Sequence, residues 1–150
     1  MKCVVHLYGR SASGKTSALE RVVRILKEKG LTVAVVKHSH HELDLPGKDT
    51  YRYIDGGSDY VLYASNRCTL FFKCDPRKVI DLLPVDVVLI EGFRSFNFGG
   101  VELEIRDPSQ IDGTIKVIMD RILSCLAKPD EGHVRGERER MGGMGSGGNI

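Results

Sequence analysis

The sequence lacks a large excess of charge of either sign, and it lacks long apolar runs. Among its 150 residues, lysine and arginine number 22 and aspartate and glutamate 20, so the formal net charge is +2. Nucleic-acid-binding proteins usually concentrate positive charge in a stripe or patch, which is missing here. No apolar run approaches the roughly 20 residues that span a bilayer, and no charged-then-apolar leader precedes the first apolar segment. We expect no nucleic-acid partner, no membrane association and a cytoplasmic location.

Paired cysteine spacings are also missing. The four cysteines are Cys3, Cys68, Cys74 and Cys125, and no two of them form a C-x-x-C motif. Structural zinc sites usually need such short paired spacings, so a zinc site is disfavoured. Cys3 falls in an apolar segment, where a buried thiol behaves as a small apolar side chain. We expect the cysteines to be reduced, structural thiols.

Short apolar segments alternate with helical patterns along the chain. Their Val, Ile and Leu content predicts strands that are covered on both faces. Helices are predicted from near Lys15 to Gly30 and at 49–55, 76–83 and 112–127. This order predicts an α/β layered sandwich with a mostly parallel sheet flanked by helices. The predicted strands are 2–8, 32–38, 59–64, 69–73, 86–92 and 101–106.

The periodic pattern ends near residue 128. Residues 1–128 therefore form one predicted domain, which is long enough to bury a core. Residues 129–150 contain seven glycines and many charged side chains, but almost nothing that a core could bury. This composition predicts a disordered tail.

Residues 9–16 read GRSASGKT and match the phosphate-binding motif G-x-x-x-x-G-K-[ST], with a strand pattern before it and a helix pattern after it. The two glycines let successive N–H groups face phosphate oxygens, and the helix start adds its positive dipole. Lys15 would contact the β and γ phosphates, and the Thr16 hydroxyl would bind Mg²⁺. We therefore expect a P-loop NTPase fold that binds a nucleoside triphosphate. The predicted contacts are Gly9, Arg10, Ser11, Ala12, Ser13, Gly14, Lys15, Thr16 and Ser17.

A carboxylate at the end of a neighbouring strand usually completes such a site. The segment VDVVLIEGF supplies Glu91 directly after a buried apolar run, and Gly92 allows a ligand to approach the backbone. We predict that Glu91 binds the magnesium ion or its water. Asp86 lies at the opposite end of the same strand, so we expect it to be a strand-start residue.

Residues 35–49, VVKHSHHELDLPGKD, follow the second predicted strand and should hang over the same pocket, because ligands of open α/β sheets bind at the carboxyl ends of the strands. Three histidines suggest a metal, but the adjacent His40 and His41 would point apart on an extended chain. We expect contacts with anionic or heteroaromatic ligand parts, or else a mobile surface loop without a ligand. Either Asp44 or Asp49 could complete the magnesium shell. The candidate contacts in this loop are His38, His41 and Asp49, with Asp44 as a metal ligand.

Together these features resemble the MobB family of molybdopterin-guanine dinucleotide biosynthesis adaptor proteins. The resemblance rests on GRSASGKT, on VAVVKHSHHELDLPGKDTYRY at 33–53 and on DVVLIEGFR at 86–94, and it covers residues 2–128 in the same order. It implies a GTP-binding homodimer with weak GTPase activity, and Mg²⁺ is the cofactor that Thr16 and Glu91 predict. It also implies that the chain assists a molybdopterin guanylyltransferase, a separate nucleotidyltransferase. A further implied partner is molybdopterin or its guanine dinucleotide. The residues themselves predict a nucleoside triphosphate, and guanine follows from the resemblance alone.

Arg10 is a candidate catalytic residue beside Lys15 and Glu91. In related P-loop dimers a lysine at the corresponding loop position reaches the partner's nucleotide, and Arg10 would supply such a cation. The alternative is that Arg10 points to solvent or pairs with a carboxylate. Two other functions stay open: a small P-loop kinase acting on a metabolite, and a GTP-dependent metallochaperone that uses the histidines.

Overall fold

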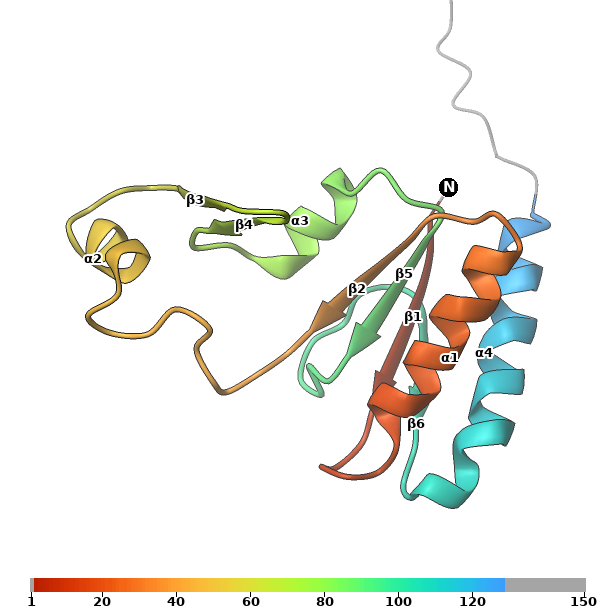
Figure 1. The fold of residues 1–150 in the computed structure, drawn as a ribbon. Coiled ribbons are helices and arrows are strands. Elements are labelled where there is room, and N and C mark those ends of the chain that lie inside the picture. Colours follow the sequence, from red (N-terminus) through yellow and green to blue (C-terminus); the bar gives the residue numbers. More distant parts are fainter. Residues whose placement is uncertain (1, 129–150) are drawn as a thin grey trace, which may run out of the picture.

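The computed structural model describes residues 2–128, and the predicted tail at 129–150 lies outside the described residues. Figure 1 shows a parallel sheet with two long helices side by side against one of its faces. Helices and strands alternate as the sequence pattern predicts. In chain order they are β1 (Cys3–Tyr8), α1 (Lys15–Glu28), β2 (Val33–Lys37), α2 (Asp49–Asp55), β3 (Val61–Ala64), β4 (Cys68–Phe71), α3 (Pro76–Leu82), β5 (Val87–Glu91), β6 (Val101–Glu104), the 3₁₀ helix η1 (Pro108–Gln110) and α4 (Ile111–Leu126).

The main sheet has four parallel strands in the order β2-β5-β1-β6. β5 lies between β2 and β1, and all its residues are buried, which explains why its sequence is continuously apolar up to its last residue. Because the strands are parallel, their carboxyl ends meet at one edge, where Leu7 and Lys37 both pair with Glu91. The expected α/β fold with a mostly parallel sheet is confirmed.

The two faces of the sheet are covered differently. Leu89 and its neighbours on one face pack against the apolar stripes of α1 and α4 and form the larger core. On the other face, Val88 and Ile90 pack against Ile80 of α3 and the side chains of Phe93 and Phe98. Neither long helix, nor any other helix among residues 2–128, has the length and hydropathy that crossing a bilayer requires.

The segment from α2 to β4, residues 49–71, forms an arm that projects from the main sheet (Figure 1). Strands β3 and β4 pair with each other in an antiparallel hairpin and form a sheet of their own. The side chains of Leu62, Tyr63 and Leu70 are exposed, and α2 contains no buried residue. The expectation that these strands are covered on both faces is therefore wrong in this chain. Short apolar runs have the same composition in a buried strand and in a hairpin, so the sequence pattern does not separate the two.

A disulfide joins Cys3, the first residue of β1, to Cys125 in the last turn of α4. The two residues are 122 positions apart in sequence, but their Cα atoms are only 5.9 Å apart. The expectation of reduced thiols is wrong for this pair, because the topology returns the end of α4 to the start of β1 and no local spacing reveals that. Cys68 and Cys74 are free thiols, and both are exposed.

Candidate functional site

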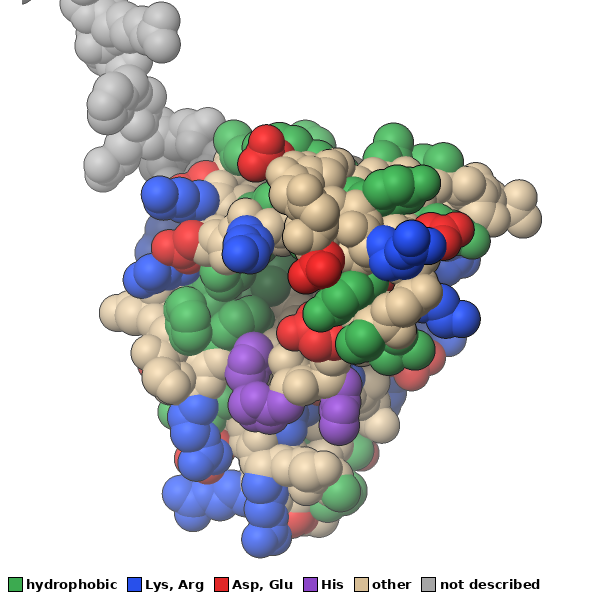
Figure 2. Space-filling model, turned by 90° about the vertical axis from the view of Figure 1, so that its left-hand side faces the viewer, with side chains coloured by type: hydrophobic (Ala, Val, Ile, Leu, Met, Phe, Trp, Pro, Cys, Tyr) green, Lys and Arg blue, Asp and Glu red, His purple; other side chains and the backbone are tan. Residues whose placement is uncertain are grey.

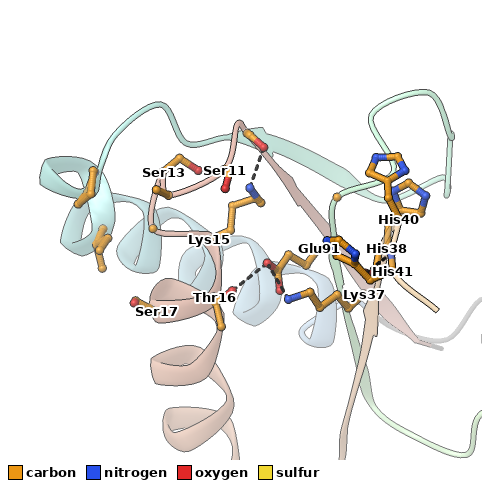
Figure 3. A pocket seen from close by; sticks show the side chains of 17 residues that line it. Ser11, Ser13, Lys15, Thr16, Ser17, Lys37, His38, His40, His41 and Glu91 are labelled. Carbon is orange, nitrogen blue, oxygen red and sulfur yellow. Dashed lines mark hydrogen bonds and ion pairs between the residues drawn. The ribbon is translucent and has the colours of Figure 1, made fainter. Parts of the chain in front are cut away.

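A cavity of about 660 Å³ lies at the carboxyl ends of β1, β5 and β2 (Figure 3). It combines the loop after β1, the first residues after β2, the end of β5 and the start of α4, so segments far apart in sequence build one site. The lining residues are Gly9, Ser11, Ala12, Ser13, Gly14, Lys15, Thr16, Ser17, Lys37, His38, Ser39, His40, His41, Glu91, Gly92, Pro108 and Ile111.

The two motif glycines are required by close packing of the phosphate-binding loop. A Cβ atom on Gly9 would lie 2.2 Å from the carbonyl oxygen of Ile105. Gly14 has a φ of +100°, and a Cβ there would meet Cγ1 of Ile111 at 2.8 Å. Ala12 also adopts a positive φ, of 60°, which is unusual for a residue other than glycine. The loop therefore packs against Ile105, directly after β6, and against the start of α4, and it lines the cavity.

The start of α1 is suited to an anion. Gly14 is the N-cap residue, it provides no side-chain cap, and the first turn contains no acidic residue. The first N–H groups of a helix have no partner within the helix, and the helix dipole makes this end positive. The Ser13 hydroxyl is 1% exposed and has no hydrogen-bond partner among the described residues, so it is a further polar group available within the loop.

Lys15 folds back over the loop. Its ammonium donates hydrogen bonds to the carbonyl oxygens of Gly9, at 2.7 Å, and Arg10, at 2.8 Å. A lysine ammonium has three N–H donors, so at least one remains available. The positive charge therefore lies across the open side of the loop, where phosphate oxygens would bind.

Glu91 is the acidic centre of the site. Only 7% of this residue is exposed, and its Oε1 accepts a hydrogen bond of 2.9 Å from the Thr16 hydroxyl. The ammonium of Lys37 lies 4.0 Å from the same oxygen, and Figure 3 shows the carboxylate between the two side chains. Sequence reasoning placed Thr16 and Glu91 but did not assign Lys37 to the site. The feature that could have revealed Lys37 is its position as the last residue of β2, because parallel pairing brings that residue opposite Glu91.

The turn after β5 connects Glu91 with the segment at residues 35–49 that contains His38, His40 and His41, here called the histidine loop. Gly92 and Phe93 both have positive φ angles, of 88° and 56°. The His38 N–H donates to the carbonyl oxygen of Glu91 at 2.9 Å, and the His38 ring lies 4.8 Å from the Phe93 ring. The His40 ring in turn lies 4.8 Å from that of His38. The backbone thus holds His38 at the cavity, and Figure 2 shows the histidine side chains gathered on the face that carries the arm.

Three predicted site residues lie elsewhere in this structure. Arg10 is exposed and does not line the cavity. Asp44 accepts a hydrogen bond of 2.5 Å from the Thr50 hydroxyl, and Asp49 begins α2, and neither lines the cavity. Within residues 2–128, no group of three or more His, Cys, Asp or Glu side chains is arranged to hold a metal ion. The structure therefore brings Thr16 and Glu91 together at the cavity, whereas Asp44 and Asp49 lie away from it.

A phosphate-binding loop between the first strand and first helix of a parallel sheet, with an acidic residue at the end of the neighbouring strand, defines the class of P-loop NTPases. The family model "Molybdopterin guanine dinucleotide synthesis protein B" (MobB) matches residues 4–123, and the chain belongs to this family.

Relatives and solved structures agree with this assignment. The chain is 35% identical over 96 residues to the molybdopterin-guanine dinucleotide biosynthesis adapter protein of Haemophilus influenzae, with 57% of this chain and 54% of the relative covered. It is 30% identical over 96 residues to that of Escherichia coli K12, with 56% and 55% covered. The chain thus spans about half the length of these relatives. The crystal structure of Bacillus subtilis MobB matches with a TM-score of 0.55 and 29% identity, covering 69% of this chain and 67% of that one.

Proposed function

We propose that this chain is a GTP-binding adapter of molybdopterin guanine dinucleotide biosynthesis that binds GTP with Mg²⁺ and hydrolyses it slowly. The observation that carries the proposal is the Thr16–Glu91 pair beside an intact phosphate-binding loop. The names of its MobB relatives support the biosynthetic pathway. The word adapter in those names supports partners in the same pathway. We propose molybdopterin and a guanylyltransferase as these partners, and a cytoplasmic location would suit that role.

Different residues of the cavity would bind the phosphates, hold Mg²⁺ and position the water. The first N–H groups of α1 would donate to the phosphate oxygens, and Lys15 would move its donors from the carbonyls of Gly9 and Arg10 to the β and γ phosphates. Thr16 and Glu91 would hold Mg²⁺, which neutralises charge on the phosphates. Through Oε1 or Oε2, Glu91 would also accept a hydrogen bond from a bound water and so orient it.

Slow hydrolysis by a single subunit follows from the cations that line its cavity. Lys15 and Lys37 are the cationic side chains among its described lining residues, and Lys37 lies beside Glu91. P-loop enzymes gain much of their rate from an additional arginine that stabilises the charge of the transferred phosphoryl group. Arg10 is exposed outside the cavity, so we propose that it serves the nucleotide of a partner subunit.

The arm supports a homodimer. An isolated two-stranded hairpin is at best marginally stable in water, and β3 and β4 expose Leu62, Tyr63 and Leu70. Leu62 and Leu70 are cross-strand partners on one face of the hairpin, and neighbouring exposed apolar side chains often mark an interface. We propose that the arm packs against a second copy of the chain, so that the exposed apolar side chains become buried.

The proposal is tested by titrating fluorescent GTP and ATP into the protein with and without Mg²⁺, and by measuring phosphate release. We expect tighter binding of GTP than of ATP, a requirement for Mg²⁺ in hydrolysis, and co-purification with a molybdopterin guanylyltransferase. Absence of triphosphate binding would overturn the proposal. Phosphate transfer to an added metabolite, without release, would instead identify a kinase.

A further inference from the structure

His6 is a buried polar residue in the middle of β1 that contacts the turn after Glu91. The residue is 1% exposed, and its Nε2 forms a hydrogen bond with the carbonyl oxygen of Gly92. A carbonyl oxygen only accepts, so Nε2 carries the proton and donates it. Nδ1 has no hydrogen-bond partner among the described residues, and the Glu102 carboxylate lies 3.8 Å from it. The one hydrogen bond of this ring is therefore directed at the turn.

His6 does not contact the nucleotide cavity. Leu7 is the residue paired with Glu91, and side chains alternate between the two faces of a strand, so His6 faces away from the Glu91 carboxylate. His6 is also absent from the cavity lining. Any effect of His6 on the site must therefore be indirect, through the turn after Glu91 and the aromatic side chains packed around it.

The turn itself needs external support. Gly92 and Phe93 are consecutive residues with positive φ, and this conformation is strained for Phe93 because it has a side chain. Two backbone hydrogen bonds hold the turn: the Gly92 N–H donates to Leu7 O at 3.0 Å, and the His38 N–H donates to Glu91 O at 2.9 Å. The imidazole of His6 adds the hydrogen bond that satisfies the Gly92 carbonyl.

The aromatic side chains around this turn form a continuous cluster. The His6 ring packs edge-on against Phe98 at 5.2 Å, Phe98 packs against Phe93 at 5.3 Å, and Phe93 packs against His38 at 4.8 Å. The cluster connects the buried centre of β1 to the exposed wall of the cavity. An aliphatic side chain at position 6 would keep much of the packing but would lose the donor.

We propose that His6 is a positioning residue: its hydrogen bond to Gly92 holds the turn that directs Glu91 toward Thr16 and His38 toward the cavity. The inference rests on the proposed nucleotide function where activity is the readout, and it has a structural readout of its own. Its role is separate from that of the phosphate-binding loop, which lies on the other side of Glu91.

The test compares His6→Leu, which lacks a donor, with His6→Gln, whose amide N–H can replace Nε2–H. Leaving the partly buried Gly92 carbonyl without its partner should raise the Mg²⁺ concentration for half-maximal hydrolysis and lower the rate by about tenfold in His6→Leu. GTP affinity without Mg²⁺ should stay within about twofold of the parent, because the loop is unchanged. His6→Gln should recover most of the rate. Val5→Ala, a buried change on the other face of β1, controls for general destabilisation and should leave the Mg²⁺ dependence unchanged.

Hydrogen exchange at the Gly92 and His38 amides provides the readout that is independent of activity. Exchange should be about tenfold faster in His6→Leu than in His6→Gln, because the Leu variant loses the bond to the turn. Equal exchange in the two variants, or parental Mg²⁺ dependence in His6→Leu, would overturn the inference. A parent that neither binds nor hydrolyses GTP would overturn the proposed function instead, and exchange alone would then decide the role of His6.

Discussion

At the scale of single residues, Lys15 tests the phosphate-binding assignment. Its ammonium contacts two loop carbonyls at the protein surface and supports no part of the core. Lys15→Ala should therefore weaken GTP binding by about a hundredfold or more and leave the melting temperature close to that of the parent. Fluorescent-nucleotide titration and thermal unfolding measure both quantities. The exposed Lys116→Ala on α4 is the matched control. Parental affinity in Lys15→Ala would refute the assignment.

A substitution of Glu91 distinguishes nucleotide binding from hydrolysis. Glu91→Gln keeps the shape of the side chain and its contact with Thr16 but removes the charge that would hold Mg²⁺ or orient its water. We expect hydrolysis to fall by about ten- to a hundredfold and GTP affinity to change much less. Single-turnover phosphate release and nucleotide titration on the same preparation provide the comparison. Unchanged hydrolysis would make Glu91 a structural residue.

At the scale of elements, Asp86 joins the starts of β2 and β5. Its carboxylate accepts hydrogen bonds from the Thr32 N–H at 2.8 Å and the Thr32 hydroxyl at 2.9 Å, which agrees with the expected strand-start role. The backbone hydrogen bond from Thr32 and then its hydroxyl hold the pKa of Asp86 below its usual 3.8.

This lowered pKa predicts the pH range in which Asp86 stabilises the fold. The contribution is present above the unfolded-state pKa and is lost as the pH falls through the folded-state pKa. Asp86→Asn should therefore be less stable than the parent at pH 7, and the difference should shrink below pH values of about 4. Urea unfolding at several pH values measures it. A difference that is independent of pH would contradict the prediction.

The disulfide joins the first strand to the last helix and so closes nearly the whole described chain into one loop. In the chain-entropy treatment, a loop of this length contributes about 4–5 kcal/mol by restricting the unfolded state. Reduction, or the Cys3→Ala/Cys125→Ala double variant, should lower the melting temperature by several degrees or more. The exposed Cys68→Ser/Cys74→Ser pair is the control and should respond to reductant as the parent does. Identical melting of the oxidised and reduced parent would show that the bond does not stabilise the fold.

At the scale of the whole molecule, the proposed role of Arg10 in a partner's site would link hydrolysis to assembly. It lies outside the cavity of its own chain, so a role across the proposed interface makes activity depend on association. Activity per chain should rise with protein concentration, and Arg10→Ala should lower it. Mixing Arg10→Ala with Lys15→Ala should restore about a quarter of the parental activity, because half of randomly mixed dimers contain one complete site. Flat activity on dilution below the dimer dissociation constant, with no recovery on mixing, would place hydrolysis in a single subunit.

The sequence by itself determined the elements and the residue types of the site. Apolar periodicity located the helices and strands, and a contiguous motif with the right flanks located the loop between β1 and α1 that lines the cavity. Glu91 was found in the same way, because a buried run that ends in a carboxylate is visible within a few residues. Each of these signals is local, since helix period, strand composition and loop chemistry depend on residues close together in the chain.

Tertiary structure alone decided which distant residues meet. Strand order and register brought Lys37 to Glu91, and the return of α4 to β1 paired Cys3 with Cys125. The same topology left the hairpin of β3 and β4 in an exposed arm, although its composition resembles that of a buried strand. These outcomes depend on contacts between residues tens of positions apart, and neither periodicity nor a short motif records which partners a folded chain brings together.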